Sequence, residues 1–284
     1  MKRQFKLANL KNVILSDNQL RSGVIGIILF LLIVILAPLV ATHNPYEFGD
    51  DILSGIRENG HIFGTNNLGQ DIFSMIIYGA RTSLRVAFIS ALISGVLGIL
   101  IGGSAGYLGG RYDQVVSEII NIFMMLPTFF LILLIIALFG NSITNVMVVI
   151  GITTWPSNAK LMRAQALSLR ERTFVKSAVA VGETRLQILF KYIIPNGIFP
   201  VIANTTVGMS NAILTEASLS FLGLGDPNIV SWGQMIYTGK AYITSAWWIS
   251  AFPGIAIVIT VIIFYLLGDG LNHVLNPMHK GGAK

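Results

Sequence analysis

Long stretches without a charged side chain divide this chain into membrane-length segments. Residues 22–46, 86–110, 192–215 and 241–268 contain no Asp, Glu, Lys or Arg, and residues 119–159 form a fifth such stretch, twice the usual length. At 1.5 Å per residue, that fifth stretch spans roughly 60 Å of helix, about two crossings of a 30 Å hydrocarbon core. Gly140-Asn141-Ser142 supplies a turn in its middle. The pattern therefore predicts an all-α integral membrane protein with six transmembrane helices.

The same pattern predicts the organisation of the chain. We expect a tail over 1–21, a first transmembrane helix over 22–41, an extracytoplasmic loop over 42–82, a five-helix membrane domain over 83–272 and a second tail over 273–284. About 20 residues precede the first apolar block, which is longer than the apolar region of a signal peptide, so we expect a membrane helix there and not a cleaved signal.

The basic residues predict the orientation. With the N-terminus inside, 15 of the 19 Lys and Arg residues fall on inner segments, seven of them between Lys160 and Lys191, in or next to the inner loop near 163–191. Lys and Arg collect on the cytoplasmic side of membrane proteins, so both termini are expected in the cytoplasm. Segment 216–247 then lies outside.

Composition excludes several other classes of protein. The chain is 54% hydrophobic and 11% charged, whereas an ordinary soluble domain carries about 25% charged residues. A soluble enzyme, a disordered chain and a nucleic-acid module are therefore poor interpretations. Cysteine is absent, which excludes disulfides and thiolate metal sites. The four histidines lack ligand-like spacing; we expect His43 and His61 to be solvated loop residues and predict no metal site.

Small residues recur every fourth position in the second predicted helix. They are Ser90, Ser94, Gly98, Gly102, Gly106 and Gly110. Such a face allows another backbone to approach closely. Packing within the subunit is the favoured interpretation, and a subunit interface or sliding surface is the alternative.

The inner loop predicts a helix–turn–helix at the membrane surface. Thr173 is a candidate N-cap for a helix over 174–181, and Gly182 is its candidate C′ residue. Thr184 and Gln187 have the spacing of a capping box that opens the next helix. From these residues alone, the first helix is either an interfacial helix on lipid headgroups or a docking helix for a cytoplasmic partner.

A resemblance favours docking. The pattern Lys176-Ser177-Ala178-x3-Gly182-x9-Tyr192-x-Ile194-Pro195 resembles the EAA loop (E-A-A-x3-G-x9-I-x-L-P) of bacterial ABC importer permeases, with Lys176 in place of the glutamate. The resemblance implies contact with a partner ATPase. The implied coupling residues are Phe174, Val175, Lys176, Ala178, Val179, Val181, Gly182, Glu183 and Thr184.

Further motifs narrow the resemblance to the dipeptide/oligopeptide permeases of the C type. The matching stretches are 63–71 (FGTNNLGQD), 78–84 (YGARTSL), Trp155-Pro156 with 167–171 (LSLRE), 216–225 (EASLSFLGLG) with 231–233 (SWG), and 268–271 (GDGL) with Asn276-Pro277. Asn66, Gln70 and Asn276 depart from the family, which more often has charge there. The resemblance implies a type I ABC importer permease fold and transport of dipeptides or oligopeptides.

The resemblance also implies partners and a location. We expect a second homologous permease subunit, two ATP-binding subunits that use ATP and Mg, an extracytoplasmic binding protein, and the cytoplasmic membrane of a bacterium or archaeon. The chain itself is expected to bind no cofactor and no nucleic acid, and to catalyse no reaction. Transport of a nickel chelate or another small solute is the alternative. A self-contained secondary transporter is disfavoured, because the predicted spans contain no ionisable relay.

Two further sets of residues are candidates for function. The possible translocation path contains Pro127, Asn204, Met209, Asn211 and Glu216. Pro127 is expected to kink the third helix, and Glu216 is expected to cap a short helix over 217–222 in preference to a role in transport. Aromatic residues of the outer segments are expected to receive the binding protein; they are Tyr46, Tyr78, Trp232, Trp247 and Trp248.

Overall fold

The computed structural model describes residues 17–275. Most of the predicted tails, with Asn276-Pro277, therefore lie outside the described residues. Within residues 17–275 all regular elements are helical, and one isolated β-bridge joins Thr65 to Asp71.

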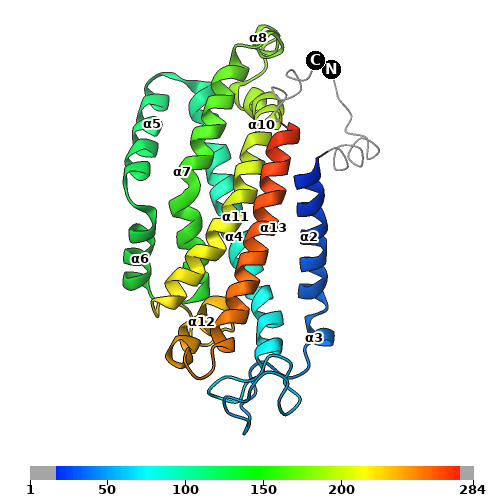
Figure 1. The fold of residues 1–284 in the computed structure, drawn as a ribbon. Helices are drawn as coiled ribbons and strands as arrows, with labels where there is room; N and C mark the ends of the chain where they lie inside the picture. Colours follow the sequence, from blue (N-terminus) through cyan, green and yellow to red (C-terminus); the bar gives the residue numbers. More distant parts are fainter. Residues whose placement is uncertain (1–16, 276–284) are drawn as a thin grey trace.

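Long helices lie side by side in one bundle (Figure 1). They are α2 (Asn18–Ile35), α4 (Ile72–Leu108), α5 (Gly110–Met125), α6 (Thr128–Phe139), α7 (Ile143–Arg170), α11 (Phe199–Phe221) and α13 (Trp248–Leu275). The shorter elements are α3 (Ala37–Val40), α8 (Thr173–Ala180), α9 (Arg185–Ile188), the π-helix η1 (Leu189–Ile193), α10 (Ile194–Gly197), α12 (Trp232–Gly239) and the 3₁₀ helix η2 (Lys240–Tyr242).

Three described helices, α2, α4 and α13, are long and apolar enough to cross a membrane. The number rises to five if the bent pairs Gly110–Met125 with Thr128–Phe139 and Arg185–Gly197 with Phe199–Phe221 each count as one span. Each of the six predicted spans corresponds to a helix or a bent pair. Length and apolarity alone accept up to five of them, and α7, which carries Lys160 and Arg163, is the exception.

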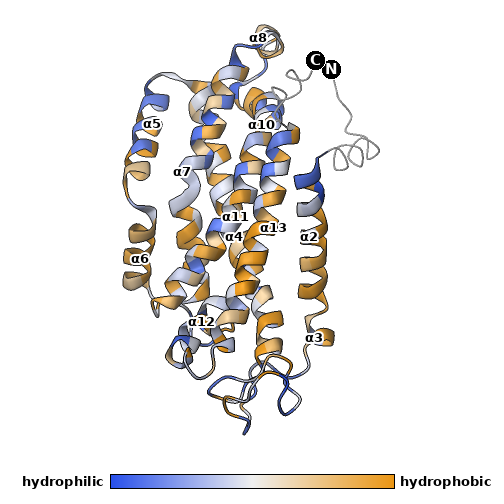
Figure 2. Ribbon diagram, in the orientation of Figure 1, coloured by the Kyte–Doolittle hydropathy of each residue, from blue (hydrophilic) through white to orange (hydrophobic). Residues whose placement is uncertain are grey.

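Apolar side chains cover the middle of the bundle and polar ones gather at its ends. In Figure 2 the helices α2, α6 and α13 are largely hydrophobic, and hydrophilic residues gather near α8 and in the loop at the opposite end. Large apolar side chains are exposed on these helices, among them Leu29, Leu134 and Ile259. The start of α2 and the end of α13 lie at the same end of the bundle as α8 (Figure 1).

The helix α4 begins much earlier than predicted, inside the segment assigned to the outer loop 42–82. Asp71 caps it by accepting a hydrogen bond from the Ser74 backbone N–H at 2.8 Å. Arg81 interrupted the charge-free pattern, but its guanidinium donates to the carbonyls of Val34 and Ile35 at the C-terminal end of α2. A cation in that position donates to carbonyls at the end of α2 and interacts favourably with the dipole of α2. Arg81 can therefore lie inside α4 without ending α4.

Leu126 and Pro127 separate α5 from α6, and the two helices are bent by 86°. Proline lacks an N–H group and its ring crowds the preceding turn. The expected kink is therefore a complete break. The turn at Gly140-Asn141-Ser142 is confirmed, and Ser142 caps α7 by accepting a hydrogen bond from the Asn145 N–H.

The small-residue face of α4 packs within the subunit, against α7. A Cβ atom at Gly98, Gly102 or Gly106 would overlap Asn158, the Ala159 carbonyl or the Arg163 carbonyl respectively. The Ser90 hydroxyl donates to the Met147 carbonyl at 2.9 Å along the same contact. Thus α4 and α7 meet at backbone distance.

Gly110 does not belong to this face, contrary to prediction. The helix α4 ends at Leu108, and Gly109 and Gly110 both have positive φ, at 68° and 64°. Gly110 opens α5, and no atom lies within 4 Å of where its Cβ would stand. The four-residue spacing continued in the sequence beyond the end of the helix.

Replacing Gly102 by Leu should destabilise the protein, because the new side chain would force the α4 and α7 backbones apart. Overpacking of this kind costs about 1–3 kcal/mol or more. We expect a lower unfolding temperature in detergent and less monodisperse protein. Gly254→Leu on α13 is the control, since no atom lies within 4 Å of its Cβ position. Equal effects of the two substitutions would contradict the close contact.

Candidate functional site

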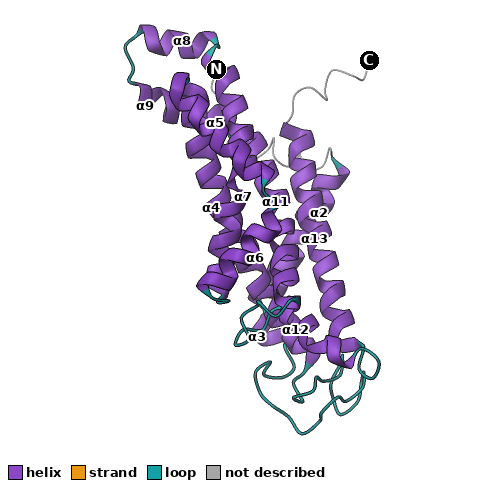
Figure 3. Cartoon of the chain, turned by 90° about the vertical axis from the view of Figure 1, so that its left-hand side faces the viewer, coloured by secondary structure: helices purple, strands orange, loops and turns teal. Residues whose placement is uncertain are grey.

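The helix α8 lies across one end of the bundle, beside α9 and away from the loop of residues 41–71 (Figure 3). Its C-terminal end is fixed by Gly182, which has φ +88°. The Gly182 N–H donates to the Val179 carbonyl and the Glu183 N–H to the Ala178 carbonyl, which is the Schellman arrangement. The predicted C′ glycine is thus confirmed.

The N-terminal cap of α8 differs from the prediction. Arg172 occupies the N-cap position, Thr173 is the first helical residue, and no side chain caps the helix. The capping box that follows is confirmed: Thr184 accepts a hydrogen bond from the Gln187 N–H, and the Gln187 side chain accepts one from the Thr184 N–H. Side-chain hydrogen bonds therefore fix the backbone after α8, whereas none caps the N-terminal end of α8.

One face of α8 is anchored and the other is free. Val175 and Ala178 are buried in a cluster with residues of α7, α9, η1 and α11, among them Met162, Ile188 and Val201. Val179 and Val181 are 56% and 84% exposed. A short helix with one face buried against the bundle and apolar residues exposed on the other can transmit a displacement from a partner into the bundle.

Three ion pairs lie in the segment 170–191, one of them between Arg170 and Glu171 at 3.4 Å. Glu183 accepts hydrogen bonds from Lys191 at 2.9 Å and from the Tyr192 hydroxyl at 2.7 Å, and these bonds lower the pKa of the Glu183 carboxyl. Lys176, which stands at the glutamate position of the EAA pattern, pairs with Glu171 at 3.1 Å. The exposed end of α8 consequently presents a cation bound to a neighbouring carboxylate.

A cavity of about 300 Å³ lies among α4, the α5–α6 break, α7 and α11. Its lining is rich in hydroxyl and amide side chains for a site in the middle of an apolar bundle. The polar lining residues are Ser90, Ser94, Thr128, Thr153, Thr154, Ser157, Asn158, Asn204, Thr205, Asn211 and Thr215.

Asn158 joins the walls of this cavity. Its side-chain N–H donates to the Ser94 hydroxyl at 3.0 Å, and its carbonyl oxygen accepts from Asn204 at 2.9 Å and Thr205 at 3.3 Å. Three helices, α4, α7 and α11, thereby meet at one buried amide. Asn158 is not among the predicted site residues, although an amide side chain in a charge-free stretch is a signal that the sequence contains.

The structure separates the predicted path residues. Asn204 and Asn211 line the cavity, and Pro127 lies in the break next to Thr128, which also lines it. Met209 instead faces an apolar hollow on another side of α11, with Phe88 and α2 residues. Glu216 lines none of these spaces.

Glu216 is an interior residue of α11 and not the cap of a separate helix over 217–222. Its carboxyl is 2% exposed and accepts hydrogen bonds from Ser220 and Ser231, both at 2.8 Å. Ser231 precedes α12, so the carboxyl ties α12 to the end of α11. The predicted capping role is wrong because α11 continues to Phe221.

The outer aromatic residues divide into structural and exposed groups. Trp232 is 2% exposed and donates to the Ile76 carbonyl, and Trp248 donates to the Thr65 carbonyl. Tyr46 and Trp247 are about half exposed. Trp232 is therefore unavailable as a docking residue, and Tyr46 and Trp247 are available.

His61 is buried, contrary to the prediction of a solvated loop residue. It is 8% exposed and lies 2.9 Å from the Asp71 carboxylate, whereas His43 is exposed. Burial raises the pKa of the Asp71 carboxyl, but hydrogen bonds from Ser74 and His61 lower it more, and the result lies below the ordinary value.

Comparison with known proteins agrees with the resemblance in the sequence. Residues 95–280 match the family described as binding-protein-dependent transport system inner membrane component. The dipeptide transport system permease protein DppC of Alkalihalophilus pseudofirmus is 38% identical, over 91% of this chain and 85% of the relative. The probable D,D-dipeptide permease DdpC of Escherichia coli is 36% identical, over 91% and 86%. The di/tripeptide permease DppC of Pseudomonas aeruginosa is 35% identical, over 92% and 90%.

The fold is also similar to solved structures. A chain of the MetNI methionine ABC transporter in an inward-facing conformation aligns with a TM-score of 0.56 at 18% identity, over 71% of this chain and 96% of that one. Members of the matched family are membrane permease subunits of ABC transporters and not enzymes; separate subunits hydrolyse ATP. This chain belongs to the family of inner membrane components of binding-protein-dependent transport systems.

Proposed function

We propose that this chain is a permease subunit of an ATP-driven importer of dipeptides or oligopeptides, coupled to its ATPases through α8. The observation that carries the coupling role is the structure of α8: Val175 and Ala178 seat one face on the bundle, and Val179 and Val181 leave the other bare. The peptide substrate is supported by relatives named for dipeptide and di/tripeptide transport. No observation favours the nickel-chelate alternative.

The proposed assembly contains a second, homologous permease, two ATP-binding subunits and an extracytoplasmic binding protein. ATP and Mg belong to the ATP-binding subunits, and this chain holds no cofactor. The end of the bundle with α8 faces the cytoplasm, together with both termini, in the cytoplasmic membrane of a bacterium or archaeon. Support comes from the basic residues, 15 of 19 of which fall on that side.

The proposed mechanism is alternating access. Closure of the two ATPases on ATP displaces α8, and the displacement passes to α7 and α9, which contact α8, and through the shared apolar cluster toward α11. Because α4, α7 and α11 share the hydrogen bonds of Asn158, they move as a unit. The two permeases rock between inward- and outward-open arrangements.

The proposed path runs along the polar cavity and includes Asn204 and Asn211. An amide side chain both donates and accepts hydrogen bonds, which suits the amide groups of a peptide backbone irrespective of its side chains. Pro127 contributes the break that opens the wall. Met209 and Glu216 lie outside this cavity and are not included in the path.

The substrate can be tested by uptake into proteoliposomes that contain the complete importer. We expect ATP-dependent uptake of a labelled dipeptide that excess unlabelled peptide inhibits and nickel–histidine does not. Gly208→Leu should reduce this uptake strongly, because Gly208 lines the cavity and has no atom within 4 Å of its Cβ position. Inhibition by nickel–histidine alone would contradict the peptide assignment.

The coupling role can be tested at Gly182 with two variants of similar size. Val strongly disfavours the positive φ of this residue, whereas Asn tolerates it. No atom lies within 4 Å of the Cβ position, so steric overlap does not confuse the result. We expect Gly182→Val to lower uptake at least about tenfold. Either the complex still hydrolyses ATP without transport, or the ATPase no longer binds to it. Gly182→Asn should behave nearly as wild type; equal coupling in both variants would remove the role assigned to α8.

Docking of the binding protein on the outer segments can be tested by crosslinking, because the chain contains no natural cysteine. Tyr46→Cys and Trp247→Cys should each crosslink to the binding protein. Val258→Cys, which is 56% exposed on the apolar surface of α13, is the control and should not. Crosslinks only to the second permease would contradict this docking surface.

A further inference from the structure

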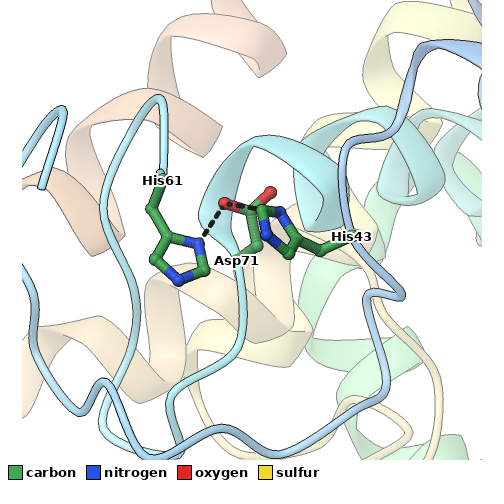
Figure 4. A group of neighbouring side chains, drawn as sticks. All are labelled: His43, His61 and Asp71. Atoms are coloured by element: carbon green, nitrogen blue, oxygen red, sulfur yellow. Dashed lines mark hydrogen bonds and ion pairs between the residues drawn. The ribbon is translucent and has the colours of Figure 1, made fainter. Parts of the chain in front are cut away.

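Three side chains from separate outer segments converge at the start of α4 (Figure 4). His43 follows α3, His61 lies in the loop before α4, and Asp71 is the N-cap of α4. The Nδ1 atoms of His61 and His43 lie 2.9 Å and 3.8 Å from the same oxygen, Oδ1 of Asp71. One ligand atom from each residue can be chosen so that all three lie within 4.8 Å of one another.

The two oxygens of the Asp71 carboxylate have different neighbours. Oδ2 accepts hydrogen bonds from the Ser74 backbone N–H at 2.8 Å and the Thr42 hydroxyl at 3.3 Å, which fixes the carboxylate in the protein. Oδ1 faces the two imidazoles. Carboxylates that bind metals are commonly held by hydrogen bonds of this kind, which orient them.

The two histidines differ in rigidity. His61 is buried, and its second ring nitrogen, Nε2, faces the exposed carboxylate of Asp51, with 3.9 Å between Nε2 and Oδ2. Asp51 itself accepts a hydrogen bond from Asn59 at 2.6 Å. The exposed His43 ring hydrogen-bonds with Thr42 at 3.0 Å and lies against the His61 ring, with 4.6 Å between centroids.

We propose that His43, His61 and Asp71 bind a zinc ion, with a fourth position left for water. Two imidazoles and one carboxylate suit zinc, whereas Mg²⁺ and Ca²⁺ prefer sites made of oxygen. Zinc lies about 2.0–2.1 Å from such ligands, so tetrahedral ligand atoms stand roughly 3.3 Å apart. Binding would therefore draw the exposed His43 ring in from 3.8 Å and widen the buried His61–Asp71 pair slightly from 2.9 Å.

The ion would tie residue 43 to residue 71 and hold the segment after α3 against the start of α4. These residues belong to the outer loop, which lies at the opposite end of the bundle from α8 (Figure 1). The site therefore acts on the shape of the outer surface and is independent of the coupling helix. The simpler alternative is a His61–Asp71 hydrogen bond with no metal, and the test distinguishes the two.

The test uses the full-length chain in detergent, purified without a polyhistidine tag and freed of metal by a chelator. After Zn²⁺ is added back and the excess is removed by dialysis, we expect one Zn²⁺ per chain by elemental analysis. We also expect Zn²⁺ to raise the unfolding temperature and Mg²⁺ not to do so. His43→Ala should bind Zn²⁺ at least about tenfold more weakly and lose that rise. His273→Ala, which removes an imidazole from the opposite end, should retain both.

A second variant covers the case in which His43→Ala yields too little protein. Asp71→Asn keeps a residue that caps helices well but removes the charged ligand, so it should fold and bind Zn²⁺ weakly. X-ray absorption of the wild-type zinc complex should show two imidazole ligands. Equal zinc binding by wild type, His43→Ala and Asp71→Asn, or no zinc in the wild type, would overturn the site and leave a hydrogen-bonded His61–Asp71 pair.

Discussion

Along Gly98, Gly102 and Gly106 the backbone of α4 lies directly against that of α7, with no space for a single added carbon atom. Lipid tails are as apolar as leucine, so helices in a bilayer are not driven together by the hydrophobic effect and depend on close packing and interhelical hydrogen bonds. The bonds between Ser90 and Met147 and between Asn158 and Ser94 supply the latter. This contact fixes α7, against which α5, α6, α8 and part of α11 pack, whereas α13 packs on α11 and α2 packs on α13.

The fixed helix α7 contacts other elements both at its end and in its middle. Toward one end, Arg163 makes a paired contact with Asp113 of α5, at 2.5 Å and 2.8 Å, and the chain then turns into α8. In the middle, Asn158 reaches α11 and closes one wall of the polar cavity. The proposed coupling helix α8 and the cavity are therefore both attached to α7, which is the arrangement that transmission of a displacement requires.

The sequence predicted those features that neighbouring residues determine. The turn at 140–142, the glycine after α8 and the Thr184–Gln187 capping box each depend on contacts within about five residues, and each is present. The membrane-length stretches likewise need only local composition. The end of α4 was missed because the repeat of small residues continues through Gly110, although the backbone changes direction at Gly109.

Distant contacts account for most of the other differences. Arg81 finds its carbonyl partners 46 and 47 residues earlier, so its charge gave a false end to the helix. Trp232 is buried in an apolar cluster with residues distant in sequence and donates to the Ile76 carbonyl, and Glu216 accepts a hydrogen bond from Ser231, 15 residues later. Asn204 and Asn211 of the cavity were predicted because they are polar residues in an apolar stretch. The bond from Asn204 to Asn158 was not, because it depends on the meeting of separate helices.

The break at Pro127 leaves unpaired backbone groups that need water or protein partners. The last carbonyls of α5 and the first N–H groups of α6 have no partner within their own helices. Backbone of this kind survives at membrane depth only if it is buried in protein or beside a hydrated space. Phe123, Met124 and Thr128, on either side of the break, line the polar cavity. We therefore expect the cavity to hold water between transport cycles, so that a peptide on the proposed path exchanges one set of hydrogen bonds for another instead of being stripped of water.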